Sequence, residues 1–265
     1  MEKTDYGRFL SAATKAARQA GEFLLSGLSQ AKKVDFKGEV DLVTTFDRQS
    51  EEMIFNELNA QFPAHNFLAE ENIRQDNHSD FSWIVDPLDG TTNFAHGLPI
   101  FCVSIALAFK GEVVVGVVYD PTRAELFSAI KEEGAVLNGR QLRVTSTAEL
   151  DKSLLATGFP YDVRTSPDNN LNYFSQFALR AQAIRRCGSA ALDLCYTACG
   201  RFDGFWEIKL KPWDLAAGSL LVKEAGGLTT DLEGSEFDLA SPDIVASNGL
   251  IHQAMLEVIR LSRIK

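Results

Sequence analysis

The sequence predicts a layered α/β protein, and three features of the chain support this class. Two helical patterns open the chain. A run of segments rich in Val, Ile and Phe follows and predicts an antiparallel meander, and after about residue 150 strands alternate with helices. Such alternation is typical of layered α/β folds. With 265 residues, 45% of them hydrophobic, the chain can bury a substantial core as one large domain or as two lobes.

The N-terminal part is predicted to form two helices and then strands. Leu and Ala recur at helical spacing from about residue 4 to 28 and give one apolar stripe. A second helix is expected over about 47–61, ended by Pro63, with a buried side formed by Met53, Ile54 and Leu58. Lys110 and Gly111 make a natural tight turn inside the meander. The strands of the meander are expected at 82–86, 100–109, 112–119 and 124–130.

The C-terminal part is predicted to alternate between strands and helices. Strands are expected at 153–158, 183–187, 204–208 and 243–247, and helices near 168–182, 189–199, 214–225 and at the C-terminus. The sequence contains no internal repeat and no long linker. We therefore expect an N-terminal lobe of residues 1–145 and a C-terminal lobe of residues 146–265 that share a close interface.

Charge and composition exclude several classes of function. The formal charge is −10, from 26 basic and 36 acidic residues, which argues against broad nonspecific binding to nucleic acids. The same surplus would repel a phosphorylated substrate unless some carboxylates hold divalent cations. The N-terminus lacks a continuous apolar stretch, so we expect no signal peptide, no membrane span and a cytoplasmic protein. Four cysteines without a CxxC pair are expected to be small buried hydrophobes in a reduced protein, namely Cys102, Cys187, Cys195 and Cys199.

The densest chemical signal is the segment WIVDPLDGTTNF at 83–94. A hydrophobic strand is expected to deliver Asp86, and a tight turn containing Pro87 to deliver Asp89, so that two carboxylates emerge together. Gly90 lets the chain pass close to a ligand. The backbone N–H groups that could face a phosphate, if a helical turn begins here, belong to Gly90, Thr91 and Thr92. The alternative interpretation is structural, because Asp, Pro and Gly are ordinary turn residues.

Two further carboxylates extend this signal. Glu70 follows an apolar run and is expected at another strand end, although adjacent glutamates are most often surface residues. Asp214 opens a helical pattern, where N-capping is the alternative, and a capping carboxylate can present its other oxygen to a cation. Carboxylate oxygens without clustered His or Cys favour Mg²⁺, with Mn²⁺ as a substitute, over zinc. Two such ions can stabilise the entering and leaving oxygens of a phosphoryl transfer.

Asp47 and Thr91 are the candidate pair for activating water. Thr91 would relay a proton that Asp47 accepts. The alternative for Asp47 is structural, because Thr44 and Asp47 have the Ser/Thr-x-x-Asp/Glu spacing of a capping box at a helix start. The spacing alone favours the capping interpretation.

Five blocks of the sequence resemble the inositol monophosphatase family of Mg²⁺-dependent, lithium-sensitive phosphatases, and the resemblance covers nearly the whole chain. The blocks are DLVTTFD at 41–47, AEEN at 69–72, WIVDPLDGTTNF at 83–94, GSAALDL at 188–194 and WDLAAGSLLVKEAGG at 213–227. The resemblance implies an αβαβα sandwich, commonly a homodimer, and hydrolysis of inositol monophosphate. Ala69 departs from the glycine that the family usually has before the paired glutamates, a change that affects only fine geometry.

The resemblance also implies roles for individual residues. The metal ligands would be Glu70, Asp86, the carbonyl of Leu88, Asp89 and Asp214. Asp47 and Thr91 would activate water, which moves the interpretation of Asp47 toward catalysis. The phosphate would lie against Gly90 and Thr91, and the substrate hydroxyls near Asp89, Ala190 and Glu207. The N-terminal lobe would thus supply most metal ligands, and the C-terminal lobe would supply Asp214 and the substrate contacts.

Alternatives to inositol monophosphate hydrolysis come from the same superfamily and from a binding role. Relatives act on fructose 1,6-bisphosphate, NADP or a nucleotide 3′-phosphate. Glu207 favours a polyol, because a carboxylate accepts hydrogen bonds from hydroxyls, whereas a second phosphate prefers cations such as Lys209 and Lys211. The segment from Arg185 is especially similar to the bacterial branch, one member of which contacts the transcription machinery. The pair Arg185 and Arg186 is a candidate for such a contact.

Overall fold

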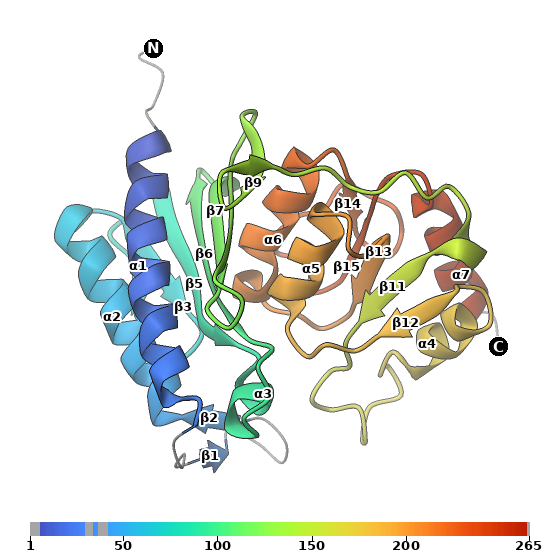
Figure 1. Ribbon diagram of the computed structural model, residues 1–265, viewed down its shortest axis with the longest axis horizontal. Helices are drawn as coiled ribbons and strands as arrows, with labels where there is room; N and C mark the ends of the chain where they lie inside the picture. The colour runs from blue at the N-terminus through green and yellow to red at the C-terminus, as the bar shows by residue number, and fades with distance from the viewer. Residues whose placement is uncertain (1–5, 30–33, 37–41, 264–265) are drawn as a thin grey trace.

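Helices and sheets alternate in five layers in the computed structural model of the protein, which describes residues 6–29, 34–36 and 42–263 (Figure 1). The first layer holds α1 (Tyr6–Gly27) and α2 (Thr45–Gln61), which pack on an eight-stranded sheet. Between that sheet and a five-stranded sheet lie α5 (Ala190–Ala198) and α6 (Pro212–Glu224). The outer face of the second sheet is covered by α4 (Leu171–Ala178) and α7 (His252–Arg263). This arrangement confirms the α/β class and the αβαβα sandwich.

The eight-stranded sheet contains the predicted meander. Its strand order is β10-β9-β8-β7-β6-β5-β3-β4, and every neighbouring pair is antiparallel except β3 with β5. Lys110 and Gly111 both have positive φ, 53° and 86°, and form the predicted tight turn between β6 and β7. The strands are β3 (Asn66–Ala69), β4 (Arg74–Gln75), β5 (Phe81–Asp89), β6 (Cys102–Phe109), β7 (Glu112–Asp120), β8 (Glu125–Ile130), β9 (Gly134–Leu137) and β10 (Arg140–Gln141).

The five-stranded sheet mixes parallel and antiparallel pairs. Its order is β12-β11-β13-β15-β14, with β11 parallel to both neighbours and β15 antiparallel to both of its own. The strands are β11 (Leu154–Thr157), β12 (Ala183–Arg185), β13 (Gly204–Glu207), β14 (Leu228–Thr230) and β15 (Ile244–Ser247). A separate antiparallel pair, β1 (Val34–Phe36) and β2 (Leu42–Thr44), precedes α2.

Close packing in the central layer fixes where α6 begins. The helix is buried over most of its length because sheets lie on both sides of it, and its residues are correspondingly apolar or small. Gly116 of β7 faces Ala217 of α6, and a Cβ at position 116 would lie 3.0 Å from the Ala217 carbonyl oxygen. The helix therefore lies almost directly on the backbone of the large sheet. Its first turn, which carries Asp214, is held near the end of β5.

The structure corrects some details of the predicted elements. Met53 is 37% exposed and does not belong to the buried side of α2, whereas Ile54 and Leu58 do. That buried side continues toward the N-terminus with polar residues, Asp47, Ser50 and Glu51, which the apolar pattern did not reveal. The elements that were not predicted are β1, β2, β4, β9, β10, β14 and the 3₁₀ turn Leu150–Lys152.

Two predictions concern the organisation of the chain. In the parts of the chain that the structure describes, no helix is long and apolar enough to cross a membrane. The division into lobes of 1–145 and 146–265 stays a prediction.

Candidate active site

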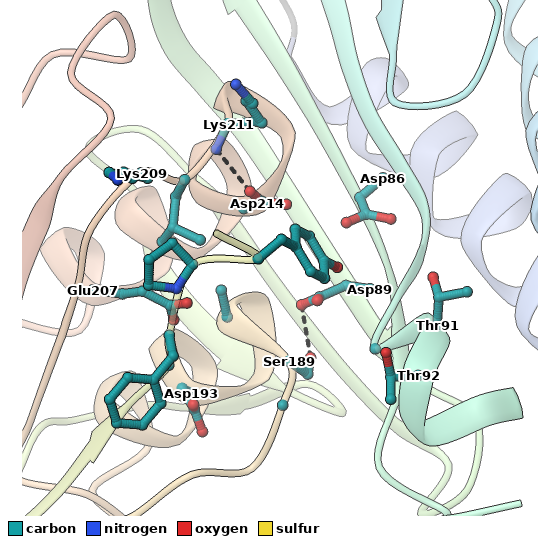
Figure 2. Close-up of a pocket in the computed structure, with 18 of the residues that line it drawn as sticks. Asp86, Asp89, Thr91, Thr92, Ser189, Asp193, Glu207, Lys209, Lys211 and Asp214 are labelled. Atoms are coloured by element: carbon teal, nitrogen blue, oxygen red, sulfur yellow. Dashed lines mark hydrogen bonds between the residues drawn. The ribbon is translucent and has the colours of Figure 1, made fainter. Parts of the chain in front are cut away.

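A cavity of about 290 Å³ opens where the end of β5 meets the first turns of α5 and α6 and the end of β13 (Figure 2). The predicted site residues that line it are Glu70, Asp86, Leu88, Asp89, Gly90, Thr91, Ala190, Glu207 and Asp214. These residues come from positions far apart in the sequence. The structure thus brings together every predicted site residue except Asp47, which lies behind Thr91.

β5 carries Asp86 and Asp89 on one continuous strand. The expected turn at Pro87 is instead a shift of register in the pairing with β6, between Asp86 and Asp89. One oxygen of Asp86 accepts a hydrogen bond from the Leu88 N–H at 2.9 Å. Oδ2 of Asp89 accepts two, from the Ser189 hydroxyl and the Ala191 N–H, each at 2.7 Å. The bulge therefore delivers both carboxylates to the cavity, and α5 fixes the second one.

Gly90 occupies a backbone conformation that favours glycine. Its φ is +97°, and a Cβ there would lie 2.9 Å from the Ile100 carbonyl oxygen. Directly after it the chain enters α3 (Thr91–Ala95), so the helical turn that the sequence suggested is present. The first N–H groups of a helix have no partner within the helix. Gly90, Thr91 and Thr92 line the cavity at this point.

Asp214 and Glu70 reach the cavity from two other elements. Asp214 is the third residue of α6, and its Oδ2 accepts the N–H of the N-cap residue Lys211 at 2.7 Å, so it supports the helix start from within the first turn and not as the N-cap that the sequence suggested. Glu70 directly follows β3, as predicted, and its N–H donates to the Val85 carbonyl at 3.2 Å. The chain after Glu70 is held by the buried Glu51, whose carboxylate accepts the N–H groups of residues 71, 72 and 73 at 2.8 to 2.9 Å.

The aspartates of this cavity repel one another. Burial raises the pKa of Asp86 well above its usual range, and the charges of Glu70, Asp89 and Asp214 raise it further. Burial also raises the pKa of Asp89, and burial with the Asp89 charge raises that of Asp214. Within the described residues, no Lys or Arg forms an ion pair with these three aspartates. Buried carboxylates that have no cationic partner are stabilised when they bind a proton or a cation.

The carboxylates surround the cavity without meeting at one point. Over residues 6–29, 34–36 and 42–263, no three His, Cys, Asp or Glu side chains are placed so that they could hold a metal ion as they stand. The donor set nevertheless has the chemistry of a site for a hard cation, because carboxylate and carbonyl oxygens are the ligands that Mg²⁺ prefers.

Asp47 makes the contacts that each of its two predicted roles requires, the capping of α2 and a hydrogen bond with Thr91. Its Oδ2 accepts the Thr44 N–H at 2.8 Å, and the capping box of α2 is complete. Its Oδ1 lies 2.9 Å from the Thr91 hydroxyl, which is also 3.0 Å from the Leu88 carbonyl oxygen. Burial raises the pKa of Asp47, and hydrogen bonds from Thr44 and Thr91 partly offset this. One carboxylate thus caps a helix and contacts the cavity wall.

Glu207 forms the end of the cavity remote from Asp86. It is buried at the end of β13, and burial together with the charge of Asp193 raises its pKa to about 8. Gly158 packs against it, and any Cβ there would overlap the Glu207 carboxylate. Among the described residues no hydrogen bond holds this carboxyl group, and it lines the cavity.

Several cavity residues were missed in the sequence. They are Arg186, Ser189, Asp193 and the segment from Gly158 to Tyr161. Asp193 had a usable signal, since it is the one charged residue in the otherwise apolar helix α5, and it is buried with its pKa raised by burial. The segment 158–161 had none, because nothing in its sequence indicates which part of the fold it covers.

The cations near the cavity differ in their surroundings. The Lys209 ammonium donates to Asp162 at 2.8 Å and to the Ser166 hydroxyl at 2.9 Å. Arg185 is exposed and donates to the Ile184 carbonyl, whereas Arg186 and Lys211 line the cavity. Both adjacent arginines are exposed, and Arg186 alone of the two lines the cavity.

The acidic, oxygen-rich cavity between the two sheets has the chemistry that suits metal-assisted hydrolysis of phosphate esters. The chain belongs to the inositol monophosphatase family, whose model matches residues 5–263. Inositol monophosphatase 1 from Solanum lycopersicum is 45% identical over 264 residues, covering 96% of this chain and 95% of that protein. The Nus factor SuhB of Escherichia coli (strain K12) is 43% identical over 254 residues, 95% of each chain.

A solved structure gives the same fold. The extragenic suppressor protein suhB from Bartonella henselae matches with a TM-score of 0.90 and 40% identity, covering 96% of this chain and 98% of that one. The chain is accordingly a phosphatase, as predicted, and acts on a phosphorylated substrate. Proteins of this family use metal ions.

The raised pKa of Glu207 predicts a pH dependence of stability. Because the folded protein keeps the proton of this carboxyl up to about pH 8, against 4.5 when unfolded, stability should fall as the pH rises through this window. Glu207→Gln removes this titration. In chelator, the loss of Tm between pH 5 and pH 8 should be smaller for Glu207→Gln than for the wild type. The exposed control Glu52→Gln should follow the wild type, and equal losses in all three proteins would contradict the assignment.

Proposed function

We propose that the protein is an Mg²⁺-dependent phosphatase that hydrolyses inositol monophosphate to inositol and phosphate. The observation that carries this proposal is the polarity of the cavity. One end has buried aspartates without a cationic partner, which suits a metal and a phosphate. The other end has the buried acceptor Glu207, which suits the hydroxyl groups of a polyol.

The metal would be held by Glu70, Asp86, Asp89, Asp214 and the carbonyl of Leu88. When bound, Mg²⁺, or Mn²⁺ in its place, supplies positive charge for the phosphate oxygens. The fit rests on the oxygen donors and on their mutual repulsion, which a divalent cation would relieve. Gly90 and Thr91 would bind the phosphate through their backbone N–H groups.

Thr91 and Asp47 would take the proton of the attacking water. Hydrolysis forms a bond between the water oxygen and phosphorus and breaks the bond between phosphorus and the polyol oxygen, which leaves as an alkoxide and takes up a proton from solvent water, while Asp47 later returns its proton to solvent. As the water gives its proton to Thr91 Oγ1, Thr91 passes its own proton to Asp47 Oδ1, 2.9 Å away. The raised pKa of the buried Asp47 makes this carboxylate a better proton acceptor.

The substrate end favours a polyol over a second phosphate. At this end the buried carboxyl groups of Glu207 and Asp193 can exchange hydrogen bonds with hydroxyl groups, and Arg186 lines the cavity beside them. Lys209, which could have bound a second phosphate, donates to Asp162 and Ser166. Asp89, Ala190 and Glu207 would then contact the substrate hydroxyls, whereas fructose 1,6-bisphosphate, NADP and nucleotide 3′-phosphates are the rival substrates.

A phosphate-release panel tests this function. With Mg²⁺, kcat/KM should be highest for inositol monophosphate and lower for fructose 1,6-bisphosphate, NADP and a nucleotide 3′-phosphate. Excess chelator should abolish turnover, and Mg²⁺ or Mn²⁺ should restore it. A higher kcat/KM on one of the rival compounds would make that compound, and not inositol monophosphate, the preferred substrate. Full turnover in chelator would refute the metal mechanism.

Asp47→Asn separates the two contacts of this residue. Asn ranks beside Asp as a helix cap, so Tm should change little. An amide cannot accept a proton from Thr91, so kcat should fall roughly 10²–10⁴-fold, the usual share of general acid–base catalysis, with KM nearly unchanged. Thr91→Ala should give a comparable loss, and the double variant should be little worse than either single one. An unchanged kcat for Asp47→Asn would show that Asp47 caps α2 and takes no part in catalysis.

A second candidate function is a contact with the transcription machinery. It is favoured by the 43% identity to the Nus factor SuhB of Escherichia coli, and Arg185 and Arg186 remain its candidate residues. Asp89→Asn should keep the fold and lose hydrolysis, because an amide loses the charge that would hold Mg²⁺. If this variant restores a deletion phenotype in cells as well as the wild type does, binding is the main role. Failure to restore it, at equal protein level, supports hydrolysis.

The homodimeric state and the cytoplasmic location stay predictions.

A further inference from the structure

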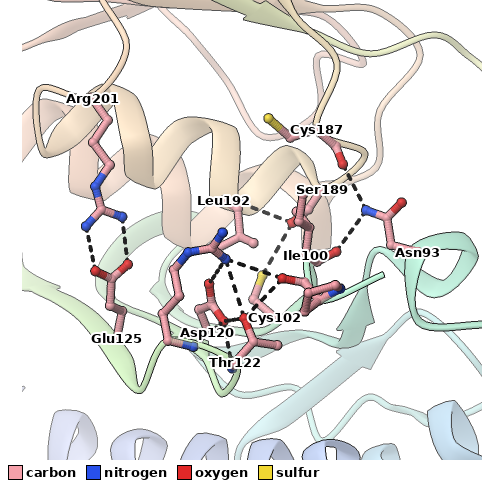
Figure 3. A network of polar contacts seen from close by, with 12 residues as sticks. Asn93, Ile100, Cys102, Asp120, Thr122, Glu125, Cys187, Ser189, Leu192 and Arg201 are labelled. Atoms are coloured by element: carbon pink, nitrogen blue, oxygen red, sulfur yellow. Dashed lines mark hydrogen bonds and ion pairs between the residues drawn. The ribbon is translucent and has the colours of Figure 1, made fainter. Parts of the chain in front are cut away.

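Asn93 lies in the segment that carries the strongest sequence signal, yet none of the roles proposed above uses it. It belongs to α3, two residues after Thr91, and its side chain is 8% exposed. Its amide nitrogen donates to the carbonyl oxygens of Ile100 and Cys187, each at 2.8 Å (Figure 3). Both amide hydrogens are thereby used, and only a donor group fits between two carbonyls.

These hydrogen bonds join two distant parts of the chain at the cavity. Asn93 and Cys187 are 94 residues apart in sequence, and Cys187 directly precedes the cavity wall formed by Gly188, Ser189 and Ala190. The contact is close, because a Cβ on Gly188 would lie 2.9 Å from the Asn93 amide nitrogen. Gly188 also has φ of +88°, so any side chain there would be strained as well as crowded.

A second set of hydrogen bonds joins the same two parts, but it depends on Asp89. Ser189 and Ala191 donate to Asp89, which is also a proposed metal ligand. The hydrogen bonds of Asn93 involve no proposed ligand. They can therefore hold the 188–190 wall while Asp89 acts on the metal and the substrate.

We propose that Asn93 is a positioning residue that keeps the 188–190 wall, where substrate hydroxyls would lie, in register with Gly90 and Thr91, where the phosphate would lie. The proposal rests on the proposed function, because it names a polyol phosphate as the substrate. A change in the relative position of these two walls should weaken recognition of the polyol. It should affect attack on the phosphate less, because the groups proposed for that step lie on the β5 side of the cavity.

Asn93→Asp tests the proposal at constant size. The new carboxylate presents an acceptor to two carbonyl oxygens and repels them. We expect kcat/KM for inositol monophosphate to fall by about tenfold or more, mainly through KM, the scale of one unsatisfied buried group. The fall for 4-nitrophenyl phosphate, which offers no hydroxyls to the wall, should be smaller. Equal falls on both substrates, or none, would overturn the proposal.

Asn248→Asp is the matched control. Asn248 is 5% exposed, and its amide nitrogen also donates to two oxygens, those of the Thr145 hydroxyl and the Thr147 carbonyl, at 2.8 and 2.7 Å. It does not line the cavity. This variant should lower Tm but leave the ratio of the two kcat/KM values at the wild-type level. A shift of that ratio as large as for Asn93→Asp would assign the effect to general destabilisation.

Gly188→Ala disturbs the same contact from the other side and serves if Asn93→Asp fails to fold. The strain of a positive φ and the crowding against the Arg186 guanidinium, 2.8 Å from that Cβ, are the same in every background, whereas the clash with the amide exists only when Asn93 is present. Gly188→Ala should therefore reduce kcat/KM for inositol monophosphate by a smaller factor in an Asn93→Ala background than in the wild type. Equal factors in both backgrounds would show that the two residues act independently and would overturn the proposal.

Hydrogen exchange separates this proposal from the proposed function. Asn93→Ala should speed amide exchange over residues 187–191, and Asn248→Asp should not. If the wild type does not prefer the polyol phosphate, the proposed function fails, while this exchange result can still support the positioning role of Asn93. If the wild type has that preference and exchange over 187–191 is unchanged in Asn93→Ala, the positioning role alone fails.

Discussion

The site depends on four aspartates that each use a carboxylate oxygen to hold the surrounding fold. Asp47, Asp86 and Asp214 accept hydrogen bonds from Thr44, Leu88 and Lys211, two or three residues away, and Asp89 accepts them from Ser189 and Ala191 of the distant α5 start. Asp86, Asp89 and Asp214 line the cavity, whereas the second oxygen of Asp47 contacts Thr91 in its wall. Those bonds fix the plane of each carboxylate and hence the place of the other oxygen. A group that caps a helix or closes a bulge is therefore positioned before any ligand arrives. Capping and chemistry, which compete as explanations of a sequence motif, are therefore compatible in one side chain.

The buried polar side of α2 provides the next level of support. Asp47, Ser50 and Glu51 follow one another at helical spacing and contact Thr91, the Pro87 carbonyl and the chain after Glu70. Burying such groups is costly unless each finds a partner, and here the partners are the Thr91 hydroxyl, the Pro87 carbonyl and the N–H groups after Glu70, which belong to the segments that bear the site residues. One helix thus anchors both acidic segments, and the apolar residues Ile54 and Leu58 beyond them attach that helix to the core.

Much of the fold and the site followed from local patterns, and the exceptions have a common cause. Segment 83–94 and the first turn of α6 fixed Asp86, Asp89 and Asp214, because strand ends and helix starts place their own side chains. Asp193, Arg186 and the segment 158–161 are in the cavity only because α5 and β11 pack where they do, which is a property of tertiary structure. Asn93 was inside the quoted motif, but its partner Cys187 is 94 residues away, and no spacing rule connects them. The short strands at the sheet edges have too few residues for a period to appear.

The charges of the cavity explain why a mobile cation suits this site better than a fixed one. The first turns of α5 and α6 both open at the cavity, and the positive ends of their dipoles favour carboxylates there. That partial charge does not suffice, because the pKa values of Asp86, Asp89 and Asp214 are still raised. A lysine in their midst would neutralise them, but it would occupy the space that the phosphate needs. A cation that binds between oxygens of the protein and of the substrate neutralises both together, so a protein of net charge −10 can accept an anionic substrate. The close packing of the central layer has to hold these carboxylates together until the cation binds, and the small residues of α6 against β7 make that packing possible.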